Sequence, residues 1–220
     1  MKTFAFDIYG TLIDPMALGQ ELKVIIGDQA ESFNNLWRDK QLEYSFRKAA
    51  MKQFNHFSEC TTQALEYCDA FFKTGLSEIQ KGELLAMYRK LPAYPETVEC
   101  LQNLKEKHEI IALSNGRKED LISLFENAGI KQYFNQIISV DEVKTFKPSP
   151  DVYNLLAQKS TSSKEDTWLV SANSFDVIGA AACGLQSIWI KRNPNAIFDP
   201  FGISYTMAFD SLMGMAEEFK

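Results

Sequence analysis

The chain has 220 residues and a net charge of −6, with 45% hydrophobic and 24% charged residues. This length and composition are ordinary for a globular protein with one core, or with one core and a smaller attached domain. The acidic balance, without any run of Lys and Arg, excludes a nucleic-acid-binding surface, because binding of the phosphate backbone needs a basic face. The longest apolar runs fall short of the roughly 20 residues that span a bilayer, so we expect no membrane partner.

The remaining compositional features concern compartment and metals. No basic segment followed by an apolar one and a cleavage site opens the chain, which predicts a cytoplasmic protein. The four cysteines and two histidines show no CxxC or zinc-type spacing. We therefore expect reduced thiols and no metal cluster.

The stretch TFAFDIYGTLID, residues 3–14, predicts a short buried strand that ends at a carboxylate, Asp7. Gly10 and Thr11 interrupt the strand pattern directly afterwards. Ligands bind at the carboxyl ends of strands in open parallel sheets, so Asp7 is a candidate functional residue. The alternative is that it only caps a turn.

The rest of the chain divides by pattern into two parts. Residues 15–89 show no convincing strand but contain helical stretches, such as residues 32–51 and 61–73. From Tyr94 onward, strand and helix patterns alternate, which predicts a parallel sheet with helices on both faces. The predicted helices are 96–107, 118–128, 150–159 and 175–183, and the predicted strands are 109–114, 136–140, 167–171 and 187–191. We expect the helical segment to cover the carboxyl end of the sheet.

Polar side chains follow the predicted strands at four places. These are Asp7 to Thr11, Ser114 to Gly116, Lys147, and Ser171 to Asp176. Each group alone has residue types that are common in turns, so it does not by itself indicate a site. One group at each strand end, in this order, predicts a site at the carboxyl edge of the sheet.

These four groups resemble the motifs of the haloacid dehalogenase superfamily. The matching sequences are DIYGTLID, LSNG, the lysine before P-x-P-x-x-Y, and S-x-N-x-x-D. The resemblance implies an α/β fold, a Rossmann-like parallel sheet with helices on both faces and an all-helical cap domain inserted after the first strand. We assign residues 1–14 and 93–220 to the catalytic core and residues 15–92 to the cap.

Two departures from the magnesium-dependent phosphatases of this superfamily bear on the reaction. Those enzymes have a second aspartate where this chain has Tyr9, and Gly-Asp where it has Ser171 and Ala172. Magnesium favours several oxygen ligands, so its site is poorly supplied and we expect no cofactor. The same substitutions, and the segment WRDKQLEY at residues 37–44, resemble the type II L-2-haloacid dehalogenases. These are metal-free enzymes whose aspartate attacks carbon.

The resemblance implies a catalytic role for several residues. Asp7 is the expected nucleophile, which Lys147 keeps ionised in a dry cleft by offsetting the effect of burial on its pKa. Thr11 and Ser171 orient the carboxylate of Asp7 by hydrogen bonds. The resulting ester is expected to be hydrolysed by water that Asp176 and Asn173 orient, with either Asp176 or Lys147 as the base.

A second set of residues is expected to bind the substrate, a small 2-haloacid. Ser114 and the backbone N–H groups of Ile8, Tyr9 and Asn115 would hold its carboxylate. Arg38 and Asn115 would face the departing halide, where negative charge develops in the transition state. Leu42 and Phe57 from the predicted cap, and Phe175 from the core, are expected to form the walls around the halogen and the alkyl group. The last candidate, Tyr153, is expected beside Lys147 and Asp176.

The expected reaction converts short L-2-haloacids to D-2-hydroxyacids with inversion. Close dehalogenases commonly have tryptophan where this chain has Phe175, so halide preference or substrate size can differ. The alternatives are a phosphatase of the same fold and a catalytically silent binding member. Apolar residues on a helical cap are also compatible with a homodimer.

Overall fold

The computed structural model describes residues 1–220 and contains one six-stranded sheet in the order β3-β2-β1-β4-β5-β6, with every neighbouring pair parallel. The strands are β1 (Thr3–Phe6), β2 (Glu109–Ser114), β3 (Gln136–Ser139), β4 (Thr167–Ser171), β5 (Gln186–Ile190) and β6 (Met207–Phe209). A parallel sheet with helical crossovers confirms the predicted α/β fold class.

The first strand lies in the middle of this sheet. Phe6 of β1 is in register with Ala112 of β2 on one side and with Val170 of β4 on the other. The carboxyl ends of these three strands therefore lie at the same level. Because the chain proceeds from β1 to β2 on one side and returns to β4 on the other, a crevice opens at this end of β1, where ligands bind in such sheets.

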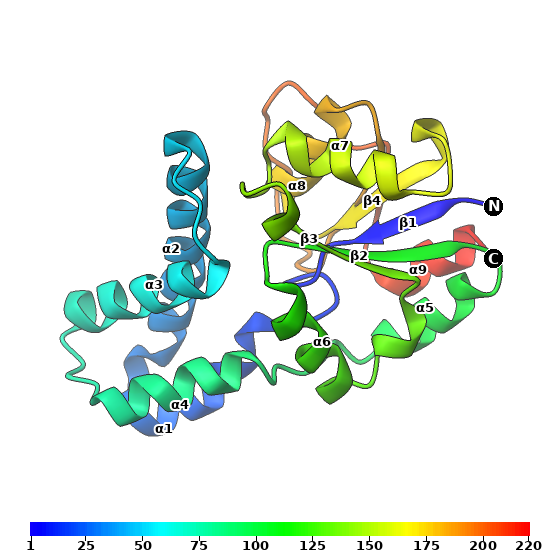
Figure 1. The fold of residues 1–220 in the computed structure, drawn as a ribbon. Coiled ribbons are helices and arrows are strands. Elements are labelled where there is room, and N and C mark those ends of the chain that lie inside the picture. The colour runs from blue at the N-terminus through cyan, green and yellow to red at the C-terminus, as the bar shows by residue number, and fades with distance from the viewer.

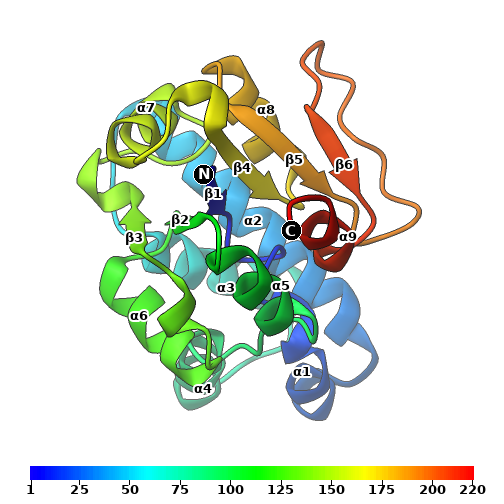
Figure 2. The ribbon, with the colours of Figure 1, turned by 90° about the vertical axis from the view of Figure 1, so that its right-hand side faces the viewer.

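Helices cover both faces of the sheet and its carboxyl edge. The helices are α1 (Gly19–Ile26), α2 (Ala30–Met51), α3 (Phe57–Phe72), α4 (Glu78–Tyr88), α5 (Thr97–Lys105), α6 (Lys118–Asn127), α7 (Pro150–Lys159), α8 (Ser174–Ala182) and α9 (Leu212–Glu218). Figure 2 shows α7 and α8 on one face and α5, α6 and α9 on the other. With both faces covered, β1, β2 and β4 are buried at every residue, which explains their continuous apolar sequences.

The first four helices are consecutive in the chain between β1 and β2, and Figure 1 shows them gathered beside the carboxyl ends of the strands. Their packing buries Trp37 of α2 completely, and its Nε1 donates to the carbonyl of Thr61 in α3 at 2.9 Å. The start of α4 is fixed by a capping box between Ser77 and Gln80. The proposed division into core and cap at residues 14/15 and 92/93 stays a prediction.

The predicted elements differ from the observed ones mainly at helix α3 and at the end of the chain. Helix α3 begins at Phe57 rather than at residue 61, and His56, its N-cap, makes no side-chain capping bond that would mark the start. No element is predicted after residue 191, where the structure adds β6 and α9. No helix combines the length and apolar character needed to cross a membrane.

Candidate active site

Asp7 follows the last residue of β1 and is 8% exposed. Its two carboxylate oxygens have different surroundings. Oδ2 accepts three hydrogen bonds, from Thr11 Oγ1 at 3.0 Å, Ser171 Oγ at 3.1 Å and Asn173 Nδ2 at 2.7 Å. Oδ1 accepts one, from Lys147 Nζ at 3.0 Å. The carboxylate is therefore fixed through Oδ2, while Oδ1 keeps a free lone pair.

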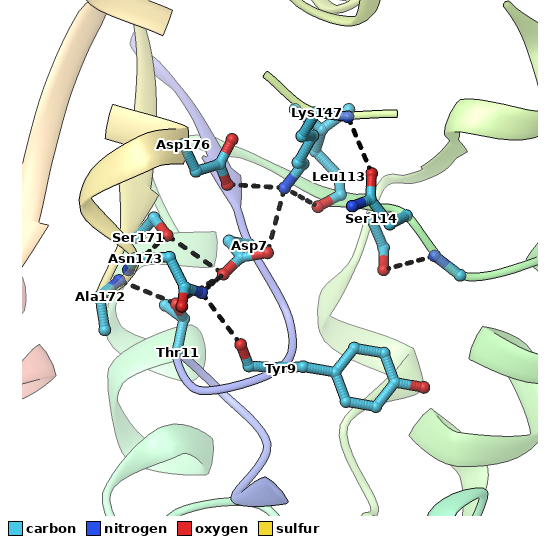
Figure 3. A network of polar contacts seen from close by, with 12 residues as sticks. Asp7, Tyr9, Thr11, Leu113, Ser114, Lys147, Ser171, Ala172, Asn173 and Asp176 are labelled. Carbon is cyan, nitrogen blue, oxygen red and sulfur yellow. Dashed lines mark hydrogen bonds and ion pairs between the residues drawn. The ribbon is translucent and has the colours of Figure 1, made fainter. Parts of the chain in front are cut away.

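Lys147 lies at the centre of the polar network in Figure 3 and is 1% exposed. Its ammonium donates to Asp7 Oδ1, to the carbonyl of Leu113 at 2.7 Å and to Asp176 Oδ2 at 2.7 Å. An ammonium group has three protons, so each of them has an acceptor. The buried cation is thus fully hydrogen-bonded and bridges two carboxylates.

Burial and the neighbouring charges have opposite effects on the pKa values of Asp7 and Lys147. Burial alone would raise the pKa of Asp7, but the positive charge and hydrogen bond of Lys147, with a contribution from Arg38, hold that pKa below its ordinary value. Burial likewise acts to lower the pKa of Lys147, and the charges of Asp176 and Asp7 raise it above its ordinary value instead. Asp7 is therefore a carboxylate and Lys147 an ammonium at neutral pH.

Asp176, in the first turn of α8, is the second carboxylate beside Lys147. Burial, opposed by Lys147 and assisted by the charge of Asp7, raises its pKa to about 6. Its Oδ1 accepts a hydrogen bond from the hydroxyl of Tyr153 at 2.7 Å. Gly179 lets this tyrosine approach α8, because a Cβ there would lie 2.5 Å from the Tyr153 hydroxyl oxygen. This arrangement leaves a base with a pKa close to neutral beside the nucleophile candidate.

A cavity of about 20 Å³ opens onto Asp7 between the sheet edge and helices α2 and α3. Its walls are Asp7, Tyr9, Arg38, Leu42, Phe57, Ser114, Asn115, Lys147 and Phe175. We call this space the reaction cavity. Arg38 of α2 brings a cation to it and donates from Nη2 to the carbonyl of Tyr9 at 3.2 Å. Aromatic and aliphatic side chains form much of the rest, so water is largely excluded from Asp7.

Hydrogen-bond donors in the reaction cavity have fixed orientations. The Oδ1 of Asn115 accepts from the backbone N–H of Lys147 at 3.0 Å, which leaves its Nδ2 free to donate. The backbone N–H groups of Ile8 and Tyr9 donate to no acceptor of the chain. Ser114 is 1% exposed, and its Oγ accepts from the N–H of Gly116 at 3.1 Å, so its own proton can point elsewhere. Neutral donors therefore surround one end of the cavity.

The structure brings the residues predicted from the strand ends together around Asp7. Tyr153 was grouped with the substrate-binding residues and expected beside Lys147 and Asp176. The hydrogen bond to Asp176 is present, but the Tyr153 side chain is fully buried and does not line the reaction cavity. It contacts the carboxylate of Asp176 rather than the space in front of Asp7. Thr11, Ser171 and Asn173 likewise contact Asp7 from outside the cavity lining.

Sequence reasoning missed Arg192, which follows β5. Its Nε donates to the carbonyl of Thr11 at 3.0 Å, and its Nη2 donates to the same oxygen. The guanidinium also pairs with Glu96 at 2.8 Å and lies 3.6 Å from the ring centre of Tyr94. Arg192 therefore fixes the turn that carries Thr11, whose hydroxyl donates to Asp7. Its position two residues after β5 is the signal that could have identified it, because polar residues at the ends of parallel strands converge.

The donor set around Asp7 is a poor match for a magnesium ion. No cluster of three or more His, Cys, Asp or Glu side chains suited to a metal is present in the chain. The two carboxylates of the site, Asp7 and Asp176, are bridged by the ammonium of Lys147, and Oδ2 of Asp7 already accepts three hydrogen bonds. A hard cation that takes six oxygen ligands would have to find most of its donors elsewhere.

Comparison with known proteins gives the family. Residues 1–184 match the haloacid dehalogenase-like hydrolases. The chain is 36% identical to (S)-2-haloacid dehalogenase 1 of Pseudomonas sp. (strain CBS-3), over 87% of this chain and 85% of that one. It is 33% identical to haloacetate dehalogenase H-2 of Moraxella sp. (strain B), over 100% of this chain and 92% of that one.

A solved structure agrees with these relatives. The L-2-haloacid dehalogenase of Xanthobacter autotrophicus with chloropropionic acid covalently bound superposes with a TM-score of 0.90 at 27% identity, over 99% of this chain and 97% of that one. The chain thus belongs to the haloacid dehalogenase-like hydrolase family, and its relatives are dehalogenases of 2-haloacids.

Proposed function

We propose that this protein is a hydrolytic dehalogenase that converts short L-2-haloacids to D-2-hydroxyacids and halide through an ester on Asp7. One observation carries the proposal. Asp7 is a buried, ionised carboxylate with a free lone pair on Oδ1, and it shares the reaction cavity with a cation, Arg38, and with neutral donors. The relatives that act on 2-haloacids and the Xanthobacter enzyme with a covalently bound chloropropionic acid support it.

The first step is displacement at carbon. Oδ1 of Asp7 attacks C2 of the haloacid from the side opposite the halogen, a C–O bond forms, and the carbon–halogen bond breaks with its electron pair on the halide. Arg38 and the Nδ2 of Asn115 are the groups that stabilise the charge developing on the halogen. Ser114 and the N–H groups of Ile8 and Tyr9 hold the carboxylate of the substrate. Backside attack inverts C2.

The second step is hydrolysis of the ester. Water attacks the carboxyl carbon of Asp7 and gives a proton to Asp176. The bond between that carbon and the ester oxygen then breaks, and the proton returns to the leaving alkoxide, which departs as the hydroxyacid. This leaves Asp7 as a carboxylic acid with one oxygen from water, and release of its proton to solvent regenerates the carboxylate. Asn173 lies close enough to Asp7 to orient the attacking water.

Asp176 fits the role of base better than Lys147. The ammonium of Lys147 uses all three protons in hydrogen bonds and has no lone pair to accept another. The pKa of Asp176, raised to about 6, suits a base that works near neutral pH. Lys147 then serves to keep Asp7 ionised and to hold the two carboxylates in place.

Substrate entry requires the cavity walls to separate. A volume of about 20 Å³ holds roughly one water molecule, which is less than a haloacid needs. Arg38, Leu42 and Phe57 come from α2 and α3, so a displacement of these helices from the sheet edge would admit the substrate. Closure afterwards would exclude water during the displacement step.

The proposal is tested by halide release from racemic 2-chloropropionate in EDTA, run beside p-nitrophenyl phosphate with magnesium. We expect halide release from at most half of the racemate, no dependence on metal, and D-lactate as the product. Phosphate release that requires magnesium, without halide release, would instead identify a phosphatase. Activity on neither substrate would support the silent binding member.

A further inference from the structure

A second cavity, of about 210 Å³, lies beside the reaction cavity. Tyr9 and Phe57 line both, so the two spaces share a wall. The second cavity is bounded by α3 and α4 on the cap side and by the first turn of α6 on the sheet side. We call it the distal cavity. It is large enough for a substituent that the reaction cavity cannot hold.

The shared wall consists of two aromatic side chains that pack against other aromatic rings. The ring of Tyr9 stacks on that of Tyr88, with centroids 5.6 Å apart, and the hydroxyl of Tyr88 donates to Gln41 at 2.8 Å. Phe57 packs against Phe146, the residue before Lys147. These contacts give the boundary between the two cavities a defined position in this closed arrangement of the cavity walls.

The distal cavity carries a net positive charge. Two arginines, Arg89 and Arg117, and one carboxylate, Asp120, are among its lining residues. Arg117 makes only a long, solvent-exposed ion pair with Glu119, at 3.6 Å, and such pairs contribute little. The Nε of Arg117 is buried and has no hydrogen-bond partner, while the side chain as a whole is 41% exposed. This guanidinium therefore has donors available for an anionic acceptor that enters the distal cavity.

The position of Arg117 relates this acceptor to the proposed reaction. Asn115, which faces the reaction cavity, is two residues before Arg117 in the chain, and Gly116 between them lines the distal cavity. A 2-haloacid whose first carboxylate is held at Ser114, Ile8 and Tyr9 would have to extend its C3 substituent past Phe57 to reach the distal cavity. An arginine binds a carboxylate there through charge-assisted hydrogen bonds.

We propose that the distal cavity binds the second carboxylate of a 2-halodicarboxylic acid, and that Arg117 is the residue that selects for it. This inference rests on the proposed function, since it extends the substrate of the same reaction. It names a substrate class, straight-chain α,ω-diacids with a halogen at C2. The shared wall formed by Tyr9 and Phe57 then separates the reacting carbon from the distal anion.

The test compares kcat/KM for the chloro derivatives of succinate, glutarate and adipate with that of the same-length 2-chloromonocarboxylates, near physiological salt. In the wild-type protein we expect the best diacid to exceed its monocarboxylate counterpart by about tenfold. Arg117→Gln should remove this preference and leave 2-chloropropionate unchanged. Asp120→Asn should increase it, because it removes the only negative charge among the three charged lining residues.

A matched control separates a binding site from general attraction of anions. Lys118 is adjacent to Arg117 and exposed, but it does not line the distal cavity, so Lys118→Gln should change neither substrate class. If Arg117 only attracted anions to the entrance, Arg117→Gln would lower kcat/KM for mono- and diacids alike, and the loss would vanish at high salt. That result, or a wild-type preference for monocarboxylates, would overturn the inference. Absence of halide release from 2-chloropropionate itself would instead overturn the proposed function.

Discussion

The ammonium of Lys147 lies 3.0 Å from Oδ1 of Asp7, and both residues are buried. Each residue keeps the other charged, since removing either charge would leave the other buried and unpaired. Asp176 shares the same ammonium at 2.7 Å, and it is the one of the three groups whose pKa lies near neutrality. The chemistry of the site should therefore respond to pH through Asp176.

The pH dependence of ester hydrolysis follows from that pKa. The pKa of Asp176 in the folded protein is raised to about 6, so the ionised base predominates above pH 6 and is lost as pH falls through that value. The pKa of Asp7 lies below its ordinary value, so the nucleophile stays ionised over the same range. We expect the rate of ester breakdown, measured in single turnovers, to fall about tenfold per unit below pH 6. A rate independent of pH across this range would exclude Asp176 as the base.

Replacing the base should separate the two chemical steps. Asp176→Asn should slow hydrolysis by about 10²–10⁴ while allowing alkylation, so the protein should accumulate with one acid unit attached to Asp7. Intact-protein mass spectrometry after incubation with 2-chloropropionate measures this. Asp210→Asn, at an exposed position, is the control and should show no adduct. If the Asp176→Asn protein turns over at the normal rate, a group other than Asp176 is the base.

Tyr153 should tune this pH dependence without touching the substrate. Its hydroxyl donates to Asp176 at 2.7 Å, and this hydrogen bond lowers the pKa of Asp176. Tyr153→Phe should therefore shift the acidic limb of the profile to higher pH. A residue that only packs against α8 would change stability and leave the limb in place. Tyr133→Phe, at a partly exposed position away from the site, serves as the control.

Arg38 should affect the departing halide more than the binding of the acid. Arg38→Gln removes a fixed cation from the reaction cavity, and we expect kcat to fall by about 10²–10³. The loss should be larger for chloride than for iodide, because the poorer leaving group depends more on stabilisation of its charge. Arg47→Gln on the same helix, where the side chain is 63% exposed, should leave both substrates unchanged. Equal losses for both halides would argue for a role in binding alone.

Arg192 should act on Asp7 through Thr11. Arg192→Ala removes the donors to the Thr11 carbonyl, so the Thr11 hydroxyl and the Asp7 carboxylate lose their fixed position. We expect kcat to fall by about tenfold to a hundredfold with a smaller change in KM, because orientation of the nucleophile is lost. Glu96→Gln, which keeps the bonds to Thr11, should have a much smaller effect. Equal effects of the two variants would indicate that the ion pair only stabilises the fold.

Much of the fold could be predicted from the sequence because buried parallel strands and amphipathic helices have distinct periods. The strands at 109–114 and 167–171 are observed with the predicted ends. The edge strand Met207–Phe209 could not be predicted, since it has three residues and none of them is buried. Helix α9 was missed with it, at the end of the same unpatterned segment.

The site was partly predictable for a related reason. Residues at the ends of parallel strands must converge, so the sequence alone predicts that Asp7, Ser114 and Ser171 lie together. Contacts between distant elements leave no such signal. The place of Arg192 after β5 follows from the same rule, but its bonds to Thr11 and the approach of Arg117 to α3 and α4 depend on how the elements pack. The contact of Tyr153 with Asp176 was expected from the family resemblance, and Gly179 leaves room for it.

The central claim, an ester on Asp7, is tested most directly by one turnover in water enriched in heavy oxygen, with the protein in excess over 2-chloropropionate. If water attacks the carboxyl carbon of Asp7, the heavy oxygen should appear in the peptide that contains Asp7, and the lactate should be unlabelled. Heavy oxygen in the lactate hydroxyl, with an unlabelled Asp7 peptide, would contradict the account.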